Sequence, residues 1–243
     1  NDAIALIDEE DYISAYESLI ALNGYKDSTE KANSIYKEYR VEKFRSAKTG
    51  DSVFLGSYEQ DNDISNGKEN IEWNVLKVED EKLLVISKYA LDCQPYNTIE
   101  ADVTWETCTL RQWLNNEFYS TAFSEEESKD ILTVTVPADP NPDFDTPPGS
   151  ATEDKIFVLS IKEAEKYITT DIENACLPTE YAIANGIITY YNRSCCSIWL
   201  RSPGKYPSAA AYIITNDDID NNGKIVDFDK EGILPAMWIN RNP

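Results

Sequence analysis

The first part of the chain places apolar and polar residues with the period of an α-helix. Two apolar stripes have i, i+3, i+4, i+7 spacing: Tyr12, Ala15, Tyr16 and Leu19, then Ala32, Ile35, Tyr36 and Tyr39. Asp27 lies three residues before Glu30, the spacing of a capping box at the start of the second helix. We therefore predict a hairpin of two helices within residues 1–47, which should either pack against the rest of the chain or continue a repeat that is lost here.

From residue 50 onwards the pattern shortens to the period of a β-strand. Residues 73–78 and 83–86 are apolar runs separated by acidic residues, which predicts a β-hairpin. The other runs predict, in chain order, a strand at 53–55, a helix at 110–118 capped by Thr107 or Thr109, a strand at 131–136, a Pro-rich loop at 137–154, a strand at 156–159, helices at 162–167 and 179–184, and strands at 209–215, 225–228 and 236–239. Because strands and helices do not alternate regularly, we predict an α+β domain over residues 48–243.

Composition narrows the function mainly by exclusion. The 243 residues include 44 acidic and 22 basic ones, and the net charge of −22 repels nucleic acid and anionic lipid surfaces. The chain has no His, which excludes imidazole-based triads and His-ligated zinc. No apolar run approaches the roughly 18 residues that span a bilayer. We therefore expect no nucleic-acid partner and no direct membrane insertion of this chain.

The five cysteines do not form a metal or redox motif. Their positions, Cys93, Cys108, Cys176, Cys195 and Cys196, include no CxxC pair. A bond between the neighbours Cys195 and Cys196 is geometrically strained. We interpret most of them as buried free thiols.

Six segments resemble, in order along the chain, a bacterial domain-of-unknown-function family, number 6273. They are residues 73–76 (WNVL), 83–91 (LLVISKYAL), 105–115 (WETCTLRQWLN), 157–160 (FVLS), 199–204 (WLRSPG) and 232–239 (GILPAMWI). The resemblance covers about residues 50–243 and implies a C-type-lectin-like fold, as in formylglycine-generating enzymes. The family has no established activity, so the resemblance assigns no catalytic residue and no copper site at Cys195 and Cys196. Leu234 stands where the family often has Arg, which leaves the role of that Arg without a counterpart here.

The sharpest local signal for a metal is the acidic run at residues 218–229. Its spacing is similar to that of a calcium-binding loop, and it nominates these ligands: Asp218, Asp220, Asn222, Asp227 and Asp229. The same residue types also suit a plain β-turn, which we keep as the alternative. A weaker run at residues 61–67 is interpreted as a solvated loop. Calcium is thus the one cofactor that the sequence suggests.

Two Trp and two Arg in these six segments are candidates for ligand binding. They are Trp105, Arg111, Trp199 and Arg201, and Arg111 lies beside Trp113 as Arg201 lies beside Trp199. A guanidinium fork beside an aromatic ring is suited to a carboxylate or a sugar. The alternative is that each Arg is an internal fork that pairs with acidic side chains and carbonyls.

We therefore expect a ligand- or partner-binding module for a glycan or peptide, and lean away from an enzyme. The alternatives are an enzyme on a formylglycine-generating-like scaffold, using carboxylates or Cys195, and a structural spacer. The resemblance implies a bacterial extracellular or cell-surface location. The helical hairpin is similar to one tetratricopeptide-like unit and would serve as a linker. Because the chain starts at Asn1 and not at Met, we interpret it as a fragment whose parent has a membrane anchor before it.

Overall fold

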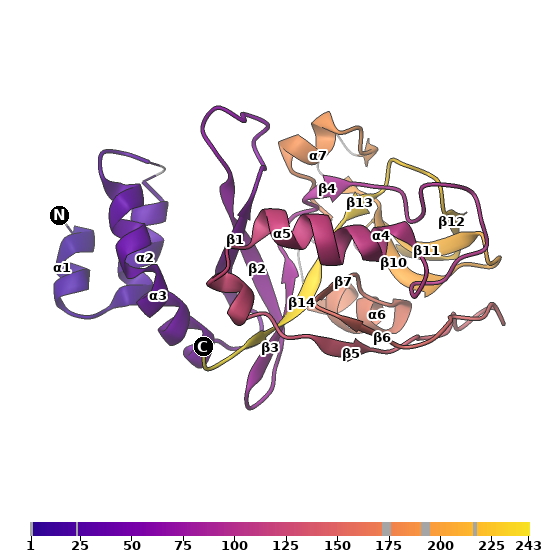
Figure 1. Ribbon diagram of the computed structural model, residues 1–243, viewed down its shortest axis with the longest axis horizontal. Helices are drawn as coiled ribbons and strands as arrows, with labels where there is room; N and C mark the ends of the chain where they lie inside the picture. Colours follow the sequence, from indigo (N-terminus) through magenta and orange to yellow (C-terminus); the bar gives the residue numbers. More distant parts are fainter. Residues whose placement is uncertain (1, 23, 172–175, 191–194, 216–217) are drawn as a thin grey trace.

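The computed structural model describes residues 2–22, 24–171, 176–190, 195–215 and 218–243. Within these ranges, three helices form the N-terminal part of the chain. They are α1 (Asp2–Asp8), α2 (Tyr12–Ile20) and α3 (Ser28–Ser46), and they lie at one end of the molecule (Figure 1). The two predicted stripes lie on α2 and α3, so the helical N-terminal region is confirmed. The prediction of only two helices is wrong, because the seven residues of α1 are too few to show an i+7 repeat.

The caps of these helices differ from the prediction. Asp11 caps α2, where its carboxylate accepts a hydrogen bond of 3.1 Å from the backbone N–H of Ser14. Asp27 stands at the N-cap of α3 but makes no side-chain cap bond, and its carboxylate pairs with Lys31 instead. The capping box predicted for Asp27 and Glu30 is therefore wrong, since an ion pair one turn along the helix takes the Asp27 carboxylate.

The helical region packs on the first strands, as expected for a unit that cannot bury its own faces. The rings of Tyr16 and Tyr39 stack with centroids 4.2 Å apart, and Phe54 lies against both. The backbone N–H of Phe54 donates to the Tyr39 hydroxyl at 3.1 Å. A buried ion pair joins Arg40 of α3 to Asp130. Aromatic stacking and a buried charge pair thus fix the helices on the main body.

The first sheet has five antiparallel strands in the order β1-β2-β3-β14-β7. They are β1 (Ser52–Tyr58), β2 (Glu69–Val78), β3 (Lys82–Ser87), β14 (Ala236–Asn240) and β7 (Ile156–Phe157). β2 and β3 form the predicted hairpin. The last strand of the chain lies between β3 and β7, so both ends of the domain share one sheet.

The second sheet has the order β12-β11-β10-β13-β4. Its strands are β12 (Asp218–Ile225), β11 (Ala209–Thr215), β10 (Ile198–Pro203), β13 (Gly232–Ile233) and β4 (Asp92–Cys93). Two small ladders complete the strands: β5 (Val134–Val136) with β6 (Thr152–Asp154), and β8 (Thr189–Tyr190) with β9 (Cys195–Cys196). The strand predicted at residues 225–228 is wrong, because β11 begins at Ala209 opposite Ile225 and offers no partner beyond it.

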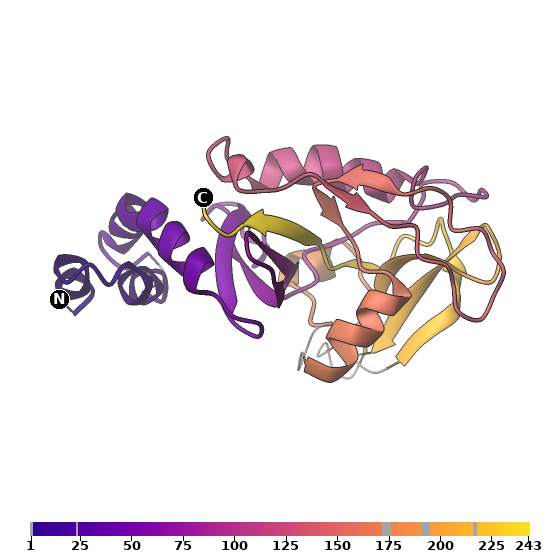
Figure 2. The same cartoon turned by 90° about the horizontal axis from the view of Figure 1, so that it is seen from below.

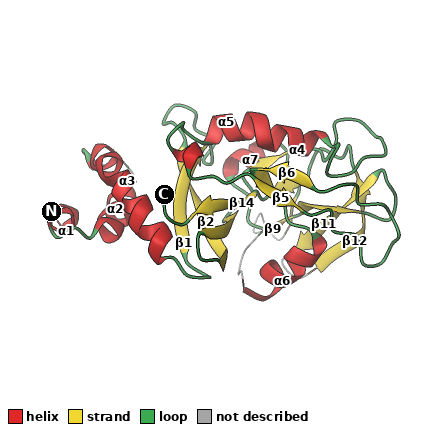
Figure 3. Ribbon diagram, turned by 60° about the horizontal axis from the view of Figure 1, so that its bottom comes forward, coloured by secondary structure: helices red, strands yellow, loops and turns green. Residues whose placement is uncertain are grey.

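Short helices cover the two faces of the strands. They are α4 (Thr109–Trp113), the π-helical turn η1 (Leu114–Phe118), α5 (Tyr119–Ala122), the 3-10 turn η2 (Glu127–Lys129), α6 (Ile161–Asp171) and α7 (Glu180–Ala184). Figures 2 and 3 show the continuous α4–η1–α5 run on one side of the strands and α6 on the other. The predicted caps Thr107 and Thr109 are wrong, since Cys108 occupies the N-cap of α4 without a side-chain bond. Thr179 caps α7 by accepting from the Ala182 N–H at 3.1 Å.

The α+β class is confirmed by this arrangement. Trp73, Trp199 and Phe118 are among the largest fully buried side chains of the main core. Within the described ranges, no helix combines the length and the apolar character needed to cross a bilayer.

Candidate functional site

The two nominated tryptophans lie inside the domain. Trp199 on β10 is 1% exposed, and its indole N–H donates to the Gln94 carbonyl at 3.0 Å. Trp105 is 3% exposed, and its indole N–H donates to the Asp154 carboxylate at 2.9 Å. Both polar groups therefore already have partners within the chain.

The two nominated arginines also have internal partners. Arg111 donates through Nε to Asp154 at 2.6 Å, so Asp154 receives both Trp105 and Arg111. Arg201 donates to the Val158 carbonyl at 3.0 Å and forms ion pairs with Asp139 and Glu163. These contacts have the form of the internal forks named as the alternative, and a role of these residues in ligand binding stays a prediction.

The first part of the acidic run at residues 218–229 forms a strand. Asp218, Asp220 and Asn222 lie on β12, whose register with β11 shifts between Asp220 and Lys224. Asp220 accepts from the Tyr212 hydroxyl at 3.1 Å and from the Asn222 N–H at 2.8 Å. The part of the run on β12 pairs with β11, and a turn follows in which the Phe228 N–H donates to the Ile225 carbonyl at 3.1 Å. The calcium loop and the β-turn both stay predictions for this run.

The downstream part of the same run does not gather its acids either. Asp227 and Asp229 lie beyond β12, in the segment before β13. Among the described residues, none of these four aspartates belongs to a group of three close carboxylates. Calcium binding by the nominated set stays a prediction that has no converging geometry behind it.

The cysteine thiols are buried and reduced. Burial raises the pKa of Cys93 and of Cys108 to about 12, so neither forms a thiolate readily at neutral pH. Cys195 is buried, and its Sγ donates to the Cys196 carbonyl at 3.6 Å.

A pocket of about 440 Å³ lies between β4, the α4–η1 run and α7. In Figure 1, α7 and the α4–α5 run lie on either side of β4. The pocket is lined by Tyr58, Asp92, Cys93, Gln94, Trp113, Glu117, Phe118, Thr121, Tyr181 and Asn185. Carboxylates, amides and aromatic rings thus meet in one hollow.

The floor of the pocket is the carboxyl group of Asp92, which is 3% exposed. It accepts hydrogen bonds from the Tyr58 hydroxyl, from the Cys93 N–H at 2.7 Å and from the Asn185 amide at 3.2 Å. Burial raises the pKa of Asp92; these three bonds oppose the rise, and the charge of Glu117 adds to it. Asp92 therefore fixes Tyr58 and Asn185 at the base of the pocket.

Four aromatic rings form a continuous wall. Trp113 contacts Phe118 with centroids 5.5 Å apart, Phe118 contacts Tyr58 at 5.2 Å, and Tyr58 contacts Tyr181 at 5.8 Å. The π-helical turn explains the first contact, because its i→i+5 pattern brings residues five apart to the same side of the helix. Such turns are frequent at functional sites.

Several polar groups of the pocket are unengaged. The Trp113 indole N–H, the Gln94 side-chain amide and the Glu117 carboxylate have no hydrogen-bond or ion-pair partner in the part of the chain that the structure describes. All three side chains are partly or fully exposed. They are therefore available to a ligand, unlike the nominated tryptophans and arginines.

Sequence reasoning did not find this pocket. It placed Trp113 beside Arg111 as a possible aromatic platform, and it placed Phe118 only on the apolar face of a helix. The available signal was Asp92-Cys93-Gln94, two polar residues around a Cys directly after the apolar run at residues 83–91. The spacing alone could not place that segment beside α7, which lies about ninety residues later.

Comparison with known proteins gives one match. The model of the family described as "Domain of unknown function (DUF6273)" matches residues 80–241, and every pocket residue except Tyr58 lies within that range. No curated protein and no solved structure matches the chain significantly. Because the match covers more than half of its residues, this chain belongs to the DUF6273 family.

Proposed function

We propose that this chain is a binding module whose Asp92 pocket takes a saccharide unit of a glycan. The observation that carries the proposal is the pair of partly exposed rings Trp113 and Tyr181, backed by the buried rings of Phe118 and Tyr58, beside three unengaged polar groups. A saccharide has C–H faces that pack on aromatic rings and hydroxyls that need both donors and acceptors. The pocket volume of about 440 Å³ lies within the usual range of small-molecule sites.

The charge of the pocket selects among saccharides. Asp92 and Glu117 both line it, in a chain whose net charge is −22. An anionic sugar or a phosphate would meet repulsion from both carboxyl groups. The proposed ligand is therefore a neutral or amine-bearing sugar; a peptide ligand is the competing outcome of the same experiment.

The finer fold and the location belong to the same proposal. We infer a C-type-lectin-like domain of the formylglycine-generating type, supported by the order of the six recurrent segments. We also infer a bacterial extracellular or cell-surface protein, supported by the resemblance and by an acidic surface suited to solubility.

A glycan array with the wild-type chain tests the proposal, followed by calorimetry with the best ligand. Trp113→Ala should weaken binding at least tenfold, because it removes one end of the aromatic wall. Trp238→Ala is the matched control: Trp238 is also partly exposed but lies on β14, outside the pocket. Binding of peptides but of no glycan would contradict the proposal. Equal glycan affinity in Trp113→Ala and Trp238→Ala would contradict it too.

One observation favours a second candidate, glycoside hydrolysis. Asp92 and Glu117 line one pocket, and the charge of Glu117 helps to raise the pKa of Asp92. Glycosidases use a protonated and an ionised carboxyl group in this way. Release of new reducing ends from an array ligand, abolished in Glu117→Gln, would establish hydrolysis; an intact ligand after prolonged incubation would exclude it.

A further inference from the structure

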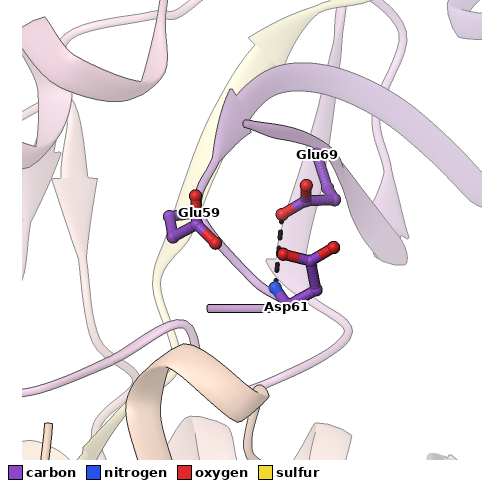
Figure 4. Close-up of side chains that lie close together, drawn as sticks. All are labelled: Glu59, Asp61 and Glu69. Atoms are coloured by element: carbon purple, nitrogen blue, oxygen red, sulfur yellow. Dashed lines mark hydrogen bonds between the residues drawn. The ribbon is translucent and has the colours of Figure 1, made fainter. Parts of the chain in front are cut away.

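The connection between β1 and β2 brings three carboxyl groups together. Glu59 follows the last residue of β1, Asp61 lies two residues later, and Glu69 opens β2. One carboxylate oxygen of each lies within 4.8 Å of those of the other two. Figure 4 shows the three side chains converging from the two sides of the connection.

One member of this cluster has a buried oxygen without a partner. Glu59 is 9% exposed, and its Oε1 atom has no hydrogen-bond partner among the residues that the structure describes. Within those residues none of the three carboxylates forms an ion pair with Lys or Arg. A buried anionic oxygen without donor or counter-charge costs folding free energy. A bound cation would supply the partner that this oxygen lacks.

Backbone donors hold the other two carboxylates in place. The N–H of Gln60 donates to Glu69 Oε2 at 2.7 Å, and the N–H of Asp63 donates to Asp61 Oδ1 at 2.8 Å. The two carboxylates are thus oriented by the backbone of the connection.

The donor set selects the ion. Three carboxyl groups meet at one point, which suits calcium with its about six to eight oxygen ligands, whereas magnesium keeps several waters and usually takes one or two carboxylates. The ligands are all hard oxygens and the chain has no His, which disfavours zinc and copper. We propose that Glu59, Asp61 and Glu69 bind a calcium ion at the base of the β1–β2 connection.

The ion would also stiffen the neighbouring part of the domain. Gln60, between two of the ligands, accepts a hydrogen bond of 3.0 Å at its carbonyl from the Tyr181 N–H of α7. Calcium at this point therefore ties the connection, β2 and α7 together, whether or not the Asp92 pocket binds a glycan.

Calorimetric titration of the metal-free chain with calcium chloride tests the proposal. We expect one site in the wild type, with affinity reduced at least tenfold in Glu59→Gln and in Asp61→Asn. Asp218→Asn with Asp229→Asn is the control, since it removes two carboxylates from the segment nominated by the sequence and should leave affinity unchanged. Magnesium should bind at least tenfold more weakly than calcium.

Thermal unfolding separates a binding defect from misfolding. In EDTA, Glu59→Gln should unfold at a higher temperature than the wild type, because it removes one of three carboxyl groups that crowd together without a cation; in calcium the order should reverse. No binding to the folded wild type would overturn the proposal. Equal affinity for magnesium and calcium would also overturn it. So would calcium affinity that is unchanged in Glu59→Gln and Asp61→Asn, or that falls only in the Asp218→Asn, Asp229→Asn control.

Discussion

The interior arginine sites and the Asp92 pocket are built from the same kinds of residue but differ in how far their polar groups are engaged. Arg201 has two carboxylates and two carbonyls around its guanidinium, and Trp199 beside it has given its N–H to Gln94. In the pocket, Trp113 and Glu117 have no such partners in the described chain. A Trp or Arg in one of the six segments that resemble the family can therefore belong to the interior framework as readily as to a binding site. The two cases differ in whether the polar atoms of the side chain already have partners within the chain.

The largest expected effect is a loss of stability when the interior Arg201 site is changed. Arg201→Ala leaves Asp139 and Glu163 without their cation inside the domain, which typically costs about 3–5 kcal/mol when a buried pair is broken. Urea unfolding measures the loss. Arg201→Lys should recover only part of it, because an ammonium cannot replace the guanidinium fork. A folded Arg201→Ala with wild-type stability would show that these contacts do not hold the fold.

Asp154→Ala should be the next most damaging change. Asp154 is 1% exposed and accepts from Trp105, Arg111 and Thr152. Its loss strands the indole N–H of Trp105 and leaves the Arg111 guanidinium only with backbone carbonyls among the described residues. We expect about 2–3 kcal/mol, less than for Arg201 because Arg111 is partly solvated. The midpoint of urea unfolding gives the value. Glu153→Ala is the neighbouring exposed control and should lose much less stability.

Changes to the pocket groups that have no partner should affect ligand binding more than stability. Gln94→Ala and Glu117→Gln should alter the free energy of unfolding by no more than about 0.5 kcal/mol, as surface substitutions usually do. Each should weaken glycan binding about tenfold, or about 1.4 kcal/mol. Parallel urea unfolding and calorimetry check both halves. A variant that loses stability but keeps its glycan affinity would show that the residue stabilises the fold and does not bind the ligand.

The smallest effect is a pH dependence of stability from Asp92. Its folded pKa is raised, chiefly by burial, so its stabilising contribution is fully present below the unfolded pKa of about 3.9 and is lost as pH rises through the folded pKa. The stability difference between the wild type and Asp92→Asn should therefore fall as pH increases through that window. Urea unfolding from about pH 3.5 to pH 7 measures it.

Glu127 supplies the control of opposite sign. Burial acts to raise its pKa, but bonds from Ser124, Tyr36 and Gly56 outweigh it and lower the pKa. Its contribution is present above the unfolded pKa and is lost as pH falls through the folded one. The difference between the wild type and Glu127→Gln should therefore rise with pH. Parallel slopes for the two pairs would contradict the assigned environments.

The elements that the sequence predicted are those whose pattern is local. The β2–β3 hairpin needs only two apolar runs and an acidic turn, and Thr179 caps α7 within three residues. β12 was not predictable in this way, because its extended form depends on pairing with β11.

The sites depend on contacts between distant residues, which is why the sequence placed them poorly. The partners of Arg201 come from residues 137–163, and Asp92 meets Tyr58 and Asn185 from opposite directions along the chain. Likewise, acidic spacing nominated Asp218–Asp229, whereas convergence occurs at Glu59, Asp61 and Glu69. Residue type and spacing identified which kinds of side chain are available but not which of them come together in the fold.

The most direct test of the pocket is NMR of the five tryptophan indole N–H groups during titration with the best glycan. Trp105 and Trp199 donate to internal acceptors, whereas Trp113 faces the pocket without one in the described chain. We predict that the Trp113 signal exchanges fastest with solvent among these three and shifts most on ligand binding. Saturable binding that moves Trp105 or Trp199 and leaves Trp113 unchanged would contradict the account.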